Sequence, residues 1–418
     1  MRAAALALAA LLAGAAPALA DDAAAVGEAA CRNLAAKVDA APFGHGGVFL
    51  RSFEPLDVPN RFDHVHANTA FVYDNALAAI ALVACGEAGR ARLIGDALVH
   101  VAANDRHFDD GRLRNAYAAG RVGIGEARLP GWWEEAEGRW LEDGFHAGSG
   151  TGNIAWAALA LVTLAEQGGP GAEGYLAAAV RLAAWTLGRQ DARGPGGFTG
   201  GTQGHEPKPD VIGWKATEHN LDLYALYDRL HRRTGEARWQ AAAAEARRFV
   251  DAMWQDGSRG FVTGTTDDGA TLNTTLRPLD AQIWPLMAVP GQAARRDAVT
   301  ALIDREFRVE ERDDVGYDFN ADRDGIWLEG TAQVATLLRL MGRDDRAAPL
   351  LRTLAADPAP GGGFYATTAP QLTTGLDDPL RPAERLRYYR RPHIAVSAWA
   401  ALAAKRFNPF TGGGGLPE

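Results

Sequence analysis

The sequence holds only two cysteines, Cys31 and Cys85, among its 418 residues. Two thiols cannot complete a common four-ligand zinc site, and no Cys-x-x-Cys motif occurs. The sequence also lacks a basic run beyond its N-terminus, and its formal net charge is −9. Because phosphate backbones are bound by clustered Lys and Arg, we expect no nucleic-acid partner. We assign neither a cofactor nor a metal from this composition.

Long apolar runs are absent after the first twenty residues, so we expect no stable membrane insertion of the mature chain. Residues 1–20 carry Arg2, then an Ala/Leu run, and end in Ala18-Leu19-Ala20. This order is typical of a secretory signal peptide, although an uncleaved anchor is the alternative. The prediction is therefore a periplasmic or secreted protein. In such an oxidising compartment Cys31 and Cys85 either form a disulfide or remain two buried thiols.

Apolar and amphipathic helical segments alternate along the rest of the chain, separated by short Gly or Pro turns within a pair and by long loops between pairs. The first members are apolar nearly all round, as buried helices must be, whereas the second members carry charge on one side. The predicted pairs are Tyr73–Gly86 with Ala88–Asn104, Thr151–Gln167 with Ala172–Arg189, Thr217–Arg233 with Glu236–Gln255, Leu279–Val289 with Gln292–Phe307, Glu329–Met341 with Asp344–Ala356, and Pro392–Phe407 with Asp22–Val38.

Six helical hairpins, the last formed by the two ends of the chain, predict an all-α fold, the (α/α)₆ toroid. An open helical solenoid is the competing architecture, but its repeats keep a fixed period that these loops do not keep. We expect one domain over residues 23–408 and a flexible, Gly-rich tail over 409–418.

Polar residues stand where each inner helix begins, and inner helices that run in one direction bring these positions to one mouth of the barrel. Helix capping explains part of the pattern. Capping does not explain why Glu218, His219 and Asn220 follow a cap that Thr217 already provides. The predicted catalytic residues are the carboxylates at the mouth, with Glu218 as the acid: Glu218, Asp74, Asp280 and Glu329.

Aromatic residues in the loops and further polar residues at the helix starts suggest a ligand that offers both C–H faces and hydroxyl groups. The loop tryptophans otherwise pack the loops onto the barrel. The predicted substrate-binding residues are Asn75, Asn153, Trp132, Trp133, Trp214, His219, Asn220, Gln282, Trp327, Gln333, Tyr389, Arg390 and His393.

Three helix starts resemble those of bacterial six-hairpin glycosidase-like proteins. They read Tyr73-Asp74-Asn75-Ala76-Leu77, Thr217-Glu218-His219-Asn220-Leu221-Asp222 and Trp327-Leu328-Glu329-Gly330-Thr331-Ala332-Gln333. The resemblance covers most of the mature chain. It implies an (α/α)₆ barrel and chemistry on a carbohydrate, but no particular substrate, because sugar epimerases and polysaccharide lyases share this toroid.

The hypothesis that follows is an exported glycoside hydrolase that cleaves an oligo- or polysaccharide with two carboxylates. A polysaccharide lyase using His219, Asn153, Tyr389 and Arg390 is the second reading. A glycan-binding protein without turnover is the third, and an epimerase is a further alternative.

An acidic segment from Asp318 to Asp324 alternates oxygen-bearing side chains and ends at Gly325, as calcium loops do. Thr331 stands where such a loop would place its bidentate Glu. An acidic surface turn therefore remains the other interpretation of this segment.

Overall fold

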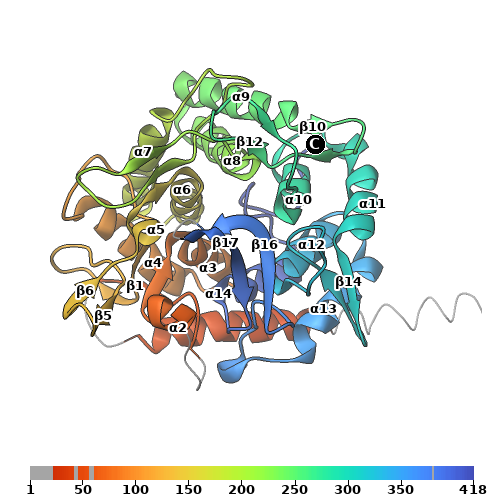
Figure 1. Cartoon of the computed structure of the whole chain (residues 1–418), viewed down its shortest axis with the longest axis horizontal. Helices are drawn as coiled ribbons and strands as arrows, with labels where there is room; N and C mark the ends of the chain where they lie inside the picture. The colour runs from red at the N-terminus through yellow and green to blue at the C-terminus, as the bar shows by residue number, and fades with distance from the viewer. Residues whose placement is uncertain (1–21, 42–45, 56–60, 379–380) are drawn as a thin grey trace, which may run out of the picture.

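The structure is a computed structural model that describes residues 22–41, 46–55, 61–378 and 381–418. The predicted signal peptide, residues 1–20, lies outside these ranges. The described chain forms two concentric rings of helices around one axis (Figure 1). The predicted (α/α)₆ toroid is thereby confirmed. None of the described helices is both long and apolar enough to cross a membrane.

The inner ring consists of six helices, each packed against the next. They are α3 (Val72–Ala84), α6 (Thr151–Glu166), α8 (Thr217–Thr234), α10 (Leu279–Ala288), α12 (Leu328–Leu340) and α14 (Ile394–Lys405). The last helix, α14, packs against the first, α3, so the ring is closed. This closure excludes the open solenoid.

The inner helices are rich in apolar residues because they are buried on all sides. In α6 every residue except Asn153 and Glu166 is buried, because α3 and α8 flank it on the ring and α7 covers its outer side. A helix with no face in water cannot be amphipathic, and its many alanines let neighbouring backbones approach.

The outer ring covers the inner one with amphipathic helices. They are α4 (Ala88–Ala103), α7 (Ala172–Leu187), α9 (Ala237–Ala252), α11 (Arg296–Glu306) and α13 (Asp344–Ala356). A single turn of 3₁₀ helix, Ala293–Arg295, leads into α11, so that helix begins four residues later than its pattern predicts. In α9 the buried residues Trp239, Ala242, Ala246 and Phe249 form one stripe that faces the inner ring.

A helix over residues 22–39 completes the outer ring beside α14, as predicted from the two ends of the chain. The Ser397 hydroxyl donates to Asn33 Oδ1 over 3.0 Å, joining the two helices. Cys31 and Cys85 form a disulfide with a Cα–Cα distance of 5.8 Å. The pairing that the sequence left open is therefore made, and it ties this helix to the end of α3.

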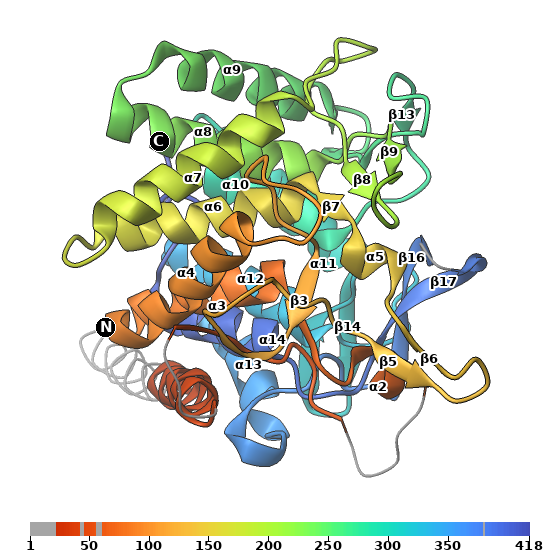
Figure 2. The ribbon, with the colours of Figure 1, turned by 90° about the vertical axis from the view of Figure 1, so that its left-hand side faces the viewer.

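Two kinds of connection join the helices. Short links such as Thr234-Gly235 lie on one side of the barrel, where Gly235 adopts a φ of +71° and donates to the His231 carbonyl to end α8. The long loops lie on the other side (Figure 2) and carry small β-hairpins that the sequence analysis did not predict.

The strands of these hairpins are β1 (Gly47–Phe49), β2 (Thr69–Phe71), β3 (Ala116–Ala118), β4 (Gly120–Val122), β5 (Trp132–Glu134), β6 (Arg139–Leu141), β7 (Ser149–Gly150), β8 (Gly201–Gln203), β9 (Asp210–Ile212), β10 (Trp254–Gln255), β11 (Gly260–Phe261), β12 (Gly264–Thr265), β13 (Leu272–Asn273), β14 (Arg308–Glu311), β15 (Asp314–Tyr317), β16 (Gln371–Asp378) and β17 (Arg381–Tyr389). Short helices α2 (Arg61–His66) and α5 (Gly144–Ala147) and a 3₁₀ turn, Pro360–Gly362, complete the loops. The longest hairpin, β16–β17, extends over the centre of the ring in Figure 1.

The C-terminal segment packs across the mouth opposite the long loops. Phe410 is 1% exposed and contacts Trp156 and Trp284 inside the barrel. Asn408 is fully buried and donates to the carbonyls of Met287 and Gly415. These contacts hold much of the predicted tail, residues 409–418, against α10.

Candidate active site

The floor of the site is built from three tryptophans of the inner helices, Trp156, Trp284 and Trp399. Their ring centroids lie 5.6 to 6.2 Å apart, so the indoles contact one another across the barrel axis. Phe410 packs against Trp156 and Trp284. We call the three tryptophans the tryptophan floor.

Each indole N–H of the tryptophan floor donates a hydrogen bond to a polar side chain. Trp399 Nε1 donates to the Tyr73 hydroxyl over 3.0 Å, and Trp284 Nε1 donates to Gln333 Oε1 over 3.0 Å. A hydrogen bond from Trp156 lowers the pKa of the Asp222 carboxyl, against the larger effect of burial. The floor thus orients the polar layer above it, since a buried N–H needs an acceptor.

Asp74, Glu329 and His393 form one group of ionisable residues above this floor, from α3, from α12 and from the residue before α14. His393 Nε2 lies 3.2 Å from Asp74 Oδ2, and His393 Nδ1 lies 3.7 Å from Glu329 Oε2. All three side chains are at most 5% exposed. We call these residues the histidine cluster.

In the histidine cluster, burial and the charges of the neighbouring groups have opposite effects on the pKa values of His393 and Glu329. Burial alone would lower the pKa of His393, but the facing Asp74 and Glu329 carboxylates outweigh it and the pKa is raised. Burial raises the pKa of Glu329 to about 7, against the opposing effect of His393. Near neutral pH, Glu329 can therefore exist as an acid or as a base.

Glu329 has one engaged and one open oxygen. Its Oε1 accepts a hydrogen bond from the Tyr73 hydroxyl over 2.7 Å. Its Oε2 has no hydrogen-bond partner among the described residues, although it is buried. A buried carboxylate oxygen without a partner is costly unless water or a ligand completes its shell.

Glu218 and Asp280, at the starts of α8 and α10, form a hydrogen-bonded carboxyl pair, which we call the acid pair. Burial, and then the Asp280 charge, hold the pKa of Glu218 well above its usual range. Burial raises the pKa of Asp280 less, to about 6, because the Glu218 hydrogen bond and backbone amides oppose it. Glu218 is therefore the protonated member near neutral pH.

Asp222 extends the acid pair downward and was not among the predicted residues. It lies one helical turn after Glu218 and is 1% exposed. Burial raises its pKa well above the usual range, and the Glu218 and Asp280 charges add to this. The i, i+4 spacing of two acids on an otherwise apolar inner helix is the signal that could have identified it.

His219 lies beside the acid pair and is held by close packing. Its ring centroid is 5.5 Å from that of Trp214. A Cβ atom added at Gly152 would lie 2.4 Å from His219 Cδ2, so α6 must begin with a glycine at this position. Burial lowers the pKa of His219 to about 4, which keeps the imidazole neutral.

Three predicted substrate-binding amides instead bind the backbone of a preceding loop residue. In each case the side-chain amide oxygen accepts from the backbone N–H of the loop residue, and the amide nitrogen donates to the backbone C=O of the same residue. The pairs are Asn75 with Leu50, Asn220 with Phe198, and Gln282 with Phe261. All three amides are fully buried. This geometry gives them a structural role in place of a ligand contact.

The remaining polar predictions divide between the mouth and its surroundings. Gln333 lies in the polar layer between Trp284 and Glu329. Asn153 is half-buried at the start of α6 and donates to Asn115 Oδ1. Arg390 points away from the histidine cluster, since it pairs with Asp357 and its guanidinium lies 3.7 Å from the Tyr365 ring centroid.

The aromatic predictions also divide. Trp214 and Tyr389 are half-buried on the loop side, whereas Trp327 is 1% exposed and packs against Phe319 and Tyr388. Tyr388, on β17, was not among the predicted site residues. Burial raises the pKa of its hydroxyl, and the charges of Glu329, Asp280 and Asp74 add to this, so Tyr388 lies near both the histidine cluster and the acid pair.

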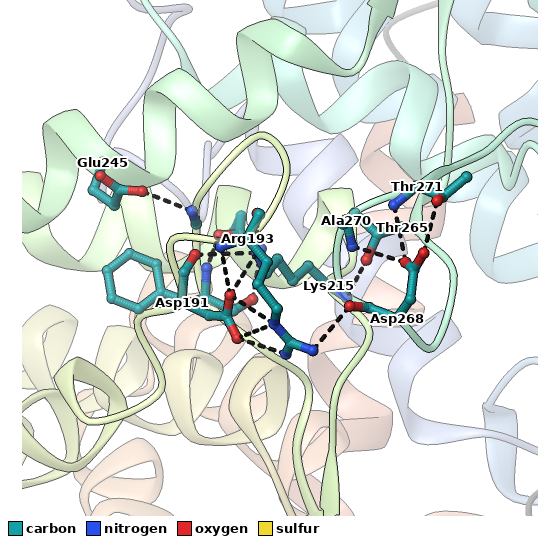
Figure 3. Close-up of polar contacts among 11 residues, drawn as sticks. Asp191, Arg193, Lys215, Glu245, Thr265, Asp268, Ala270 and Thr271 are labelled. Atoms are coloured by element: carbon teal, nitrogen blue, oxygen red, sulfur yellow. Dashed lines mark hydrogen bonds and ion pairs between the residues drawn. The ribbon is translucent and has the colours of Figure 1, made fainter.

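A buried lysine fixes the loop that leads into Glu218 (Figure 3). Lys215 Nζ donates to the carbonyls of Asp191 (3.0 Å) and Arg193 (2.7 Å) and lies 3.2 Å from Asp191 Oδ1. Arg193 in turn donates to the Asp268 carbonyl. Only two residues lie between this anchor and Glu218, so the network sets where α8 begins.

The predicted calcium-like segment fastens the β16–β17 hairpin. One carboxylate oxygen from each of Asp318, Asp322 and Asp324 lies within 4.8 Å of the others. Asp322 accepts from the Thr373 hydroxyl and Asp324 from the Thr373 N–H. Burial raises the pKa of Asp318 to about 8 and its side chain is fully buried, whereas Asp322 and Asp324 are exposed, as in an acidic surface turn.

Comparisons with known proteins identify the fold. Neither a protein-family model nor a curated protein sequence matches the chain. Among solved structures, a glycosidase is similar with a TM-score of 0.61 and 14% identity over 92% of this chain and 97% of that one. A glycosidase in complex with glucose is similar with a TM-score of 0.60, 14% identity and the same coverage.

Two further solved structures are similar to this chain. A family 76 α-mannanase from Bacteroides thetaiotaomicron is similar with a TM-score of 0.56 and 11% identity over 91% of this chain and 95% of that one. A cellobiose 2-epimerase from Bacillus thermoamylovorans gives 0.55 and 10% over 87% and 94%. The chain therefore has the six-hairpin glycosidase-like fold.

Proposed function

We propose that this protein is an exported glycoside hydrolase whose two carboxyl groups come from the acid pair and the histidine cluster. The observation that carries this proposal is the placement of Glu218 and Glu329 in unlike surroundings on different inner helices of one mouth, Glu218 beside Asp280 and Glu329 beside His393. Glycoside hydrolysis needs one protonated carboxyl group and one carboxylate near the same bond.

In the proposed mechanism, Glu218 is the general acid. Its proton passes to the glycosidic oxygen as the bond from that oxygen to the anomeric carbon breaks. Burial keeps Glu218 protonated at neutral pH, and Asp280 adds to this because a second negative charge beside it is unfavourable. Asp280 is therefore a positioning residue and not the second catalytic carboxylate.

Glu329 supplies the second carboxylate through its open oxygen, Oε2. It either removes a proton from the water that attacks the anomeric carbon or attacks that carbon itself, after which water releases the sugar. The configuration of the first product, measured by proton NMR, separates these two routes. Asp74 is less suited to this step because its Oδ2 lies within hydrogen-bond distance of His393 Nε2 (3.2 Å), whereas Glu329 Oε2 lies 3.7 Å from His393 Nδ1.

The substrate that suits this mouth is a neutral oligo- or polysaccharide. The five carboxyl groups of the mouth disfavour a uronate, and the half-buried Trp214 and Tyr388 offer aromatic rings to sugar faces. The similar structures include a glucose complex and an α-mannanase, which is consistent with a hexose at this site.

Glu218→Gln is the decisive substitution. It keeps the shape of the side chain but removes the transferable proton, so we expect kcat to fall by about 10²- to 10⁴-fold. Reducing-end release from neutral glycans is the assay. Glu173→Gln, on the exposed first turn of α7, is the matched control and should retain full activity. Full activity of Glu218→Gln would refute the assignment.

The polysaccharide lyase reading loses support from the position of Arg390. A lyase needs a cation to neutralise the uronate, and Arg390 instead pairs with Asp357. Ultraviolet absorbance of the products, which reports a new C=C bond, tests this reading directly. Binding of glycans with no product in any assay would favour the non-catalytic alternative.

A sugar epimerase is a second candidate, favoured by the two histidines. His219 is neutral, whereas the pKa of His393 is raised, so one could remove and the other return a proton. Incubation in deuterated water distinguishes the two functions. An epimerase incorporates deuterium into its sugar at carbon, whereas a hydrolase releases new reducing ends.

Export is supported by the disulfide between Cys31 and Cys85, because such bonds persist in oxidising compartments. Cell fractionation combined with N-terminal sequencing tests it. We expect the mature protein in the periplasm or the medium, beginning at Asp21. A chain that retains Met1 and stays with the membrane would support the uncleaved anchor.

A further inference from the structure

The β5–β6 hairpin presents two large aromatic side chains to solvent outside the candidate active site. Trp133 and Trp140 are each 49% exposed, and they are paired residues of the two antiparallel strands. Paired residues point to the same face of a hairpin, with Cβ atoms about 5 Å apart. The two indoles are therefore exposed on the same face of the hairpin, and we call these two residues the Trp surface.

The opposite face of this hairpin is anchored to the body of the protein. Trp132 is half-buried, and its ring lies edge-on to His64 with centroids 6.0 Å apart. A Cβ atom at Gly131 would lie 2.5 Å from Trp140 Nε1, so the Trp140 indole rests directly on this glycine. The orientation of the Trp surface is thus fixed on one side and at one end.

The Trp surface is separate from the mouth. In Figure 1 the β5–β6 hairpin lies at the periphery, outside the ring of helices, while the β16–β17 hairpin lies over the centre. Figure 2 places the β5–β6 hairpin on the side of the long loops, where the mouth opens. No ring contact joins Trp133 or Trp140 to another aromatic side chain within the described part of the chain, so core packing does not explain them.

The charges around the Trp surface restrict what can bind there. Between Trp132 and Leu141 the hairpin carries three acids, Glu134, Glu135 and Glu137, and one base, Arg139. This net negative charge opposes a polyanion or an anionic membrane. It supplies carboxylate acceptors for hydroxyl groups beside two exposed aromatic faces, and a neutral sugar chain offers both hydroxyl groups and C–H faces.

We propose that the Trp surface is a second glycan-binding site, which holds a neutral polysaccharide at the rim while another part of the chain occupies the mouth. This inference rests on the proposed function for the class of ligand. A second contact on the same polymer raises the local concentration of substrate at the mouth without taking part in bond cleavage.

The test is affinity electrophoresis through gels that contain yeast α-mannan, barley β-glucan, starch or, as an anionic control, polygalacturonate. We expect at least one neutral polysaccharide to retard the protein and polygalacturonate to leave it unretarded. Trp133→Ala/Trp140→Ala should weaken that binding by about tenfold or more, and Trp133→Phe/Trp140→Phe should restore most of it. Val211→Ala, which trims an exposed side chain of β9, is the matched control.

The outcomes separate this inference from the proposed function. If the alanine pair binds every neutral polysaccharide as the unchanged protein does, or if none is bound, the second site is refuted even where hydrolysis is intact. Tryptophan-dependent binding to phosphatidylglycerol vesicles in place of glycans would also refute it. Tryptophan-dependent glycan binding without any hydrolysis would support the second site and overturn the proposed function.

Discussion

Gly152 is the position where the smallest substitution should disturb the proposed active site. A Cβ atom there would lie 2.4 Å from His219 Cδ2 and 2.8 Å from His219 Nε2. Ordinary carbon contacts begin at about 3.5 Å, so the imidazole or the start of α6 must move by roughly 1 Å. Forced overpacking of this kind costs about 1–3 kcal/mol.

The functional effect of Gly152→Ala should exceed the loss of stability. His219 follows Glu218 directly, so a displaced imidazole also shifts the general acid. A misplacement of about 1 Å can cost on the order of 10²-fold in rate. We therefore expect kcat/KM for the identified glycan to fall by about 10- to 100-fold, while urea denaturation reports a lower free energy of unfolding.

A control substitution at a second glycine and a double-mutant cycle test whether the clash with His219 causes these effects. Gly174, in the helix α7, has no atom within 4 Å of an added Cβ, so Gly174→Ala should raise the free energy of unfolding by up to about 1 kcal/mol and leave activity unchanged. In a His219→Ala background the cost of Gly152→Ala should disappear. The same cost in both backgrounds would refute the proposed clash.

Three further predictions concern the carboxyl groups and the disulfide. Asp280→Asn removes the charge that raises the pKa of Glu218, so the basic limb of the pH profile of kcat/KM should move to lower pH; an unchanged limb would contradict the acid pair. The folded pKa of Glu329 is raised from 4.5 to about 7. This group therefore stabilises the fold at low pH, and the free energy of unfolding should fall by up to about 3 kcal/mol as pH rises from about 4.5 to 7. Glu329→Gln should remove that decrease when urea denaturation is compared at pH 4 and pH 8. Cys31→Ser/Cys85→Ser opens a link with a sequence separation of 54, which should lower the free energy of unfolding by about 4 kcal/mol; a loss below about 1 kcal/mol would show that packing alone holds residues 22–39.

The helices could be predicted because the two rings impose different patterns on the sequence. A helix such as α6, buried on all sides, must be apolar all round, and α9, exposed on one side, must be amphipathic. The short links that hold Gly235 and similar residues then mark the ends of the helices. Both signals are local, so neither needs knowledge of the fold.

The details of the site depend on contacts between distant segments, which the sequence pattern does not encode. Asn75 and Gln282 stand where ligand-binding amides were predicted, but each binds a backbone strand that arrives from an earlier loop. Arg390 follows the aromatic Tyr389 in sequence but turns to Asp357, which lies 33 residues away. The carboxyl groups were easier to predict, because an acid at the start of an apolar helix is costly to bury without a purpose.

The closure of the ring by the two ends of the chain has a consequence for the order of synthesis. The helix over residues 22–39 emerges first, but its inner partner, α14, emerges last. This amphipathic outer helix therefore lacks its inner partner until α14 has been made, and the ring cannot close before α14 is released. The bond between Cys31 and Cys85 involves only early residues, so it can hold that helix beside α3 until α14 arrives. Truncation within α14 should thus leave an open, protease-sensitive chain at both of its ends, although only one end was cut.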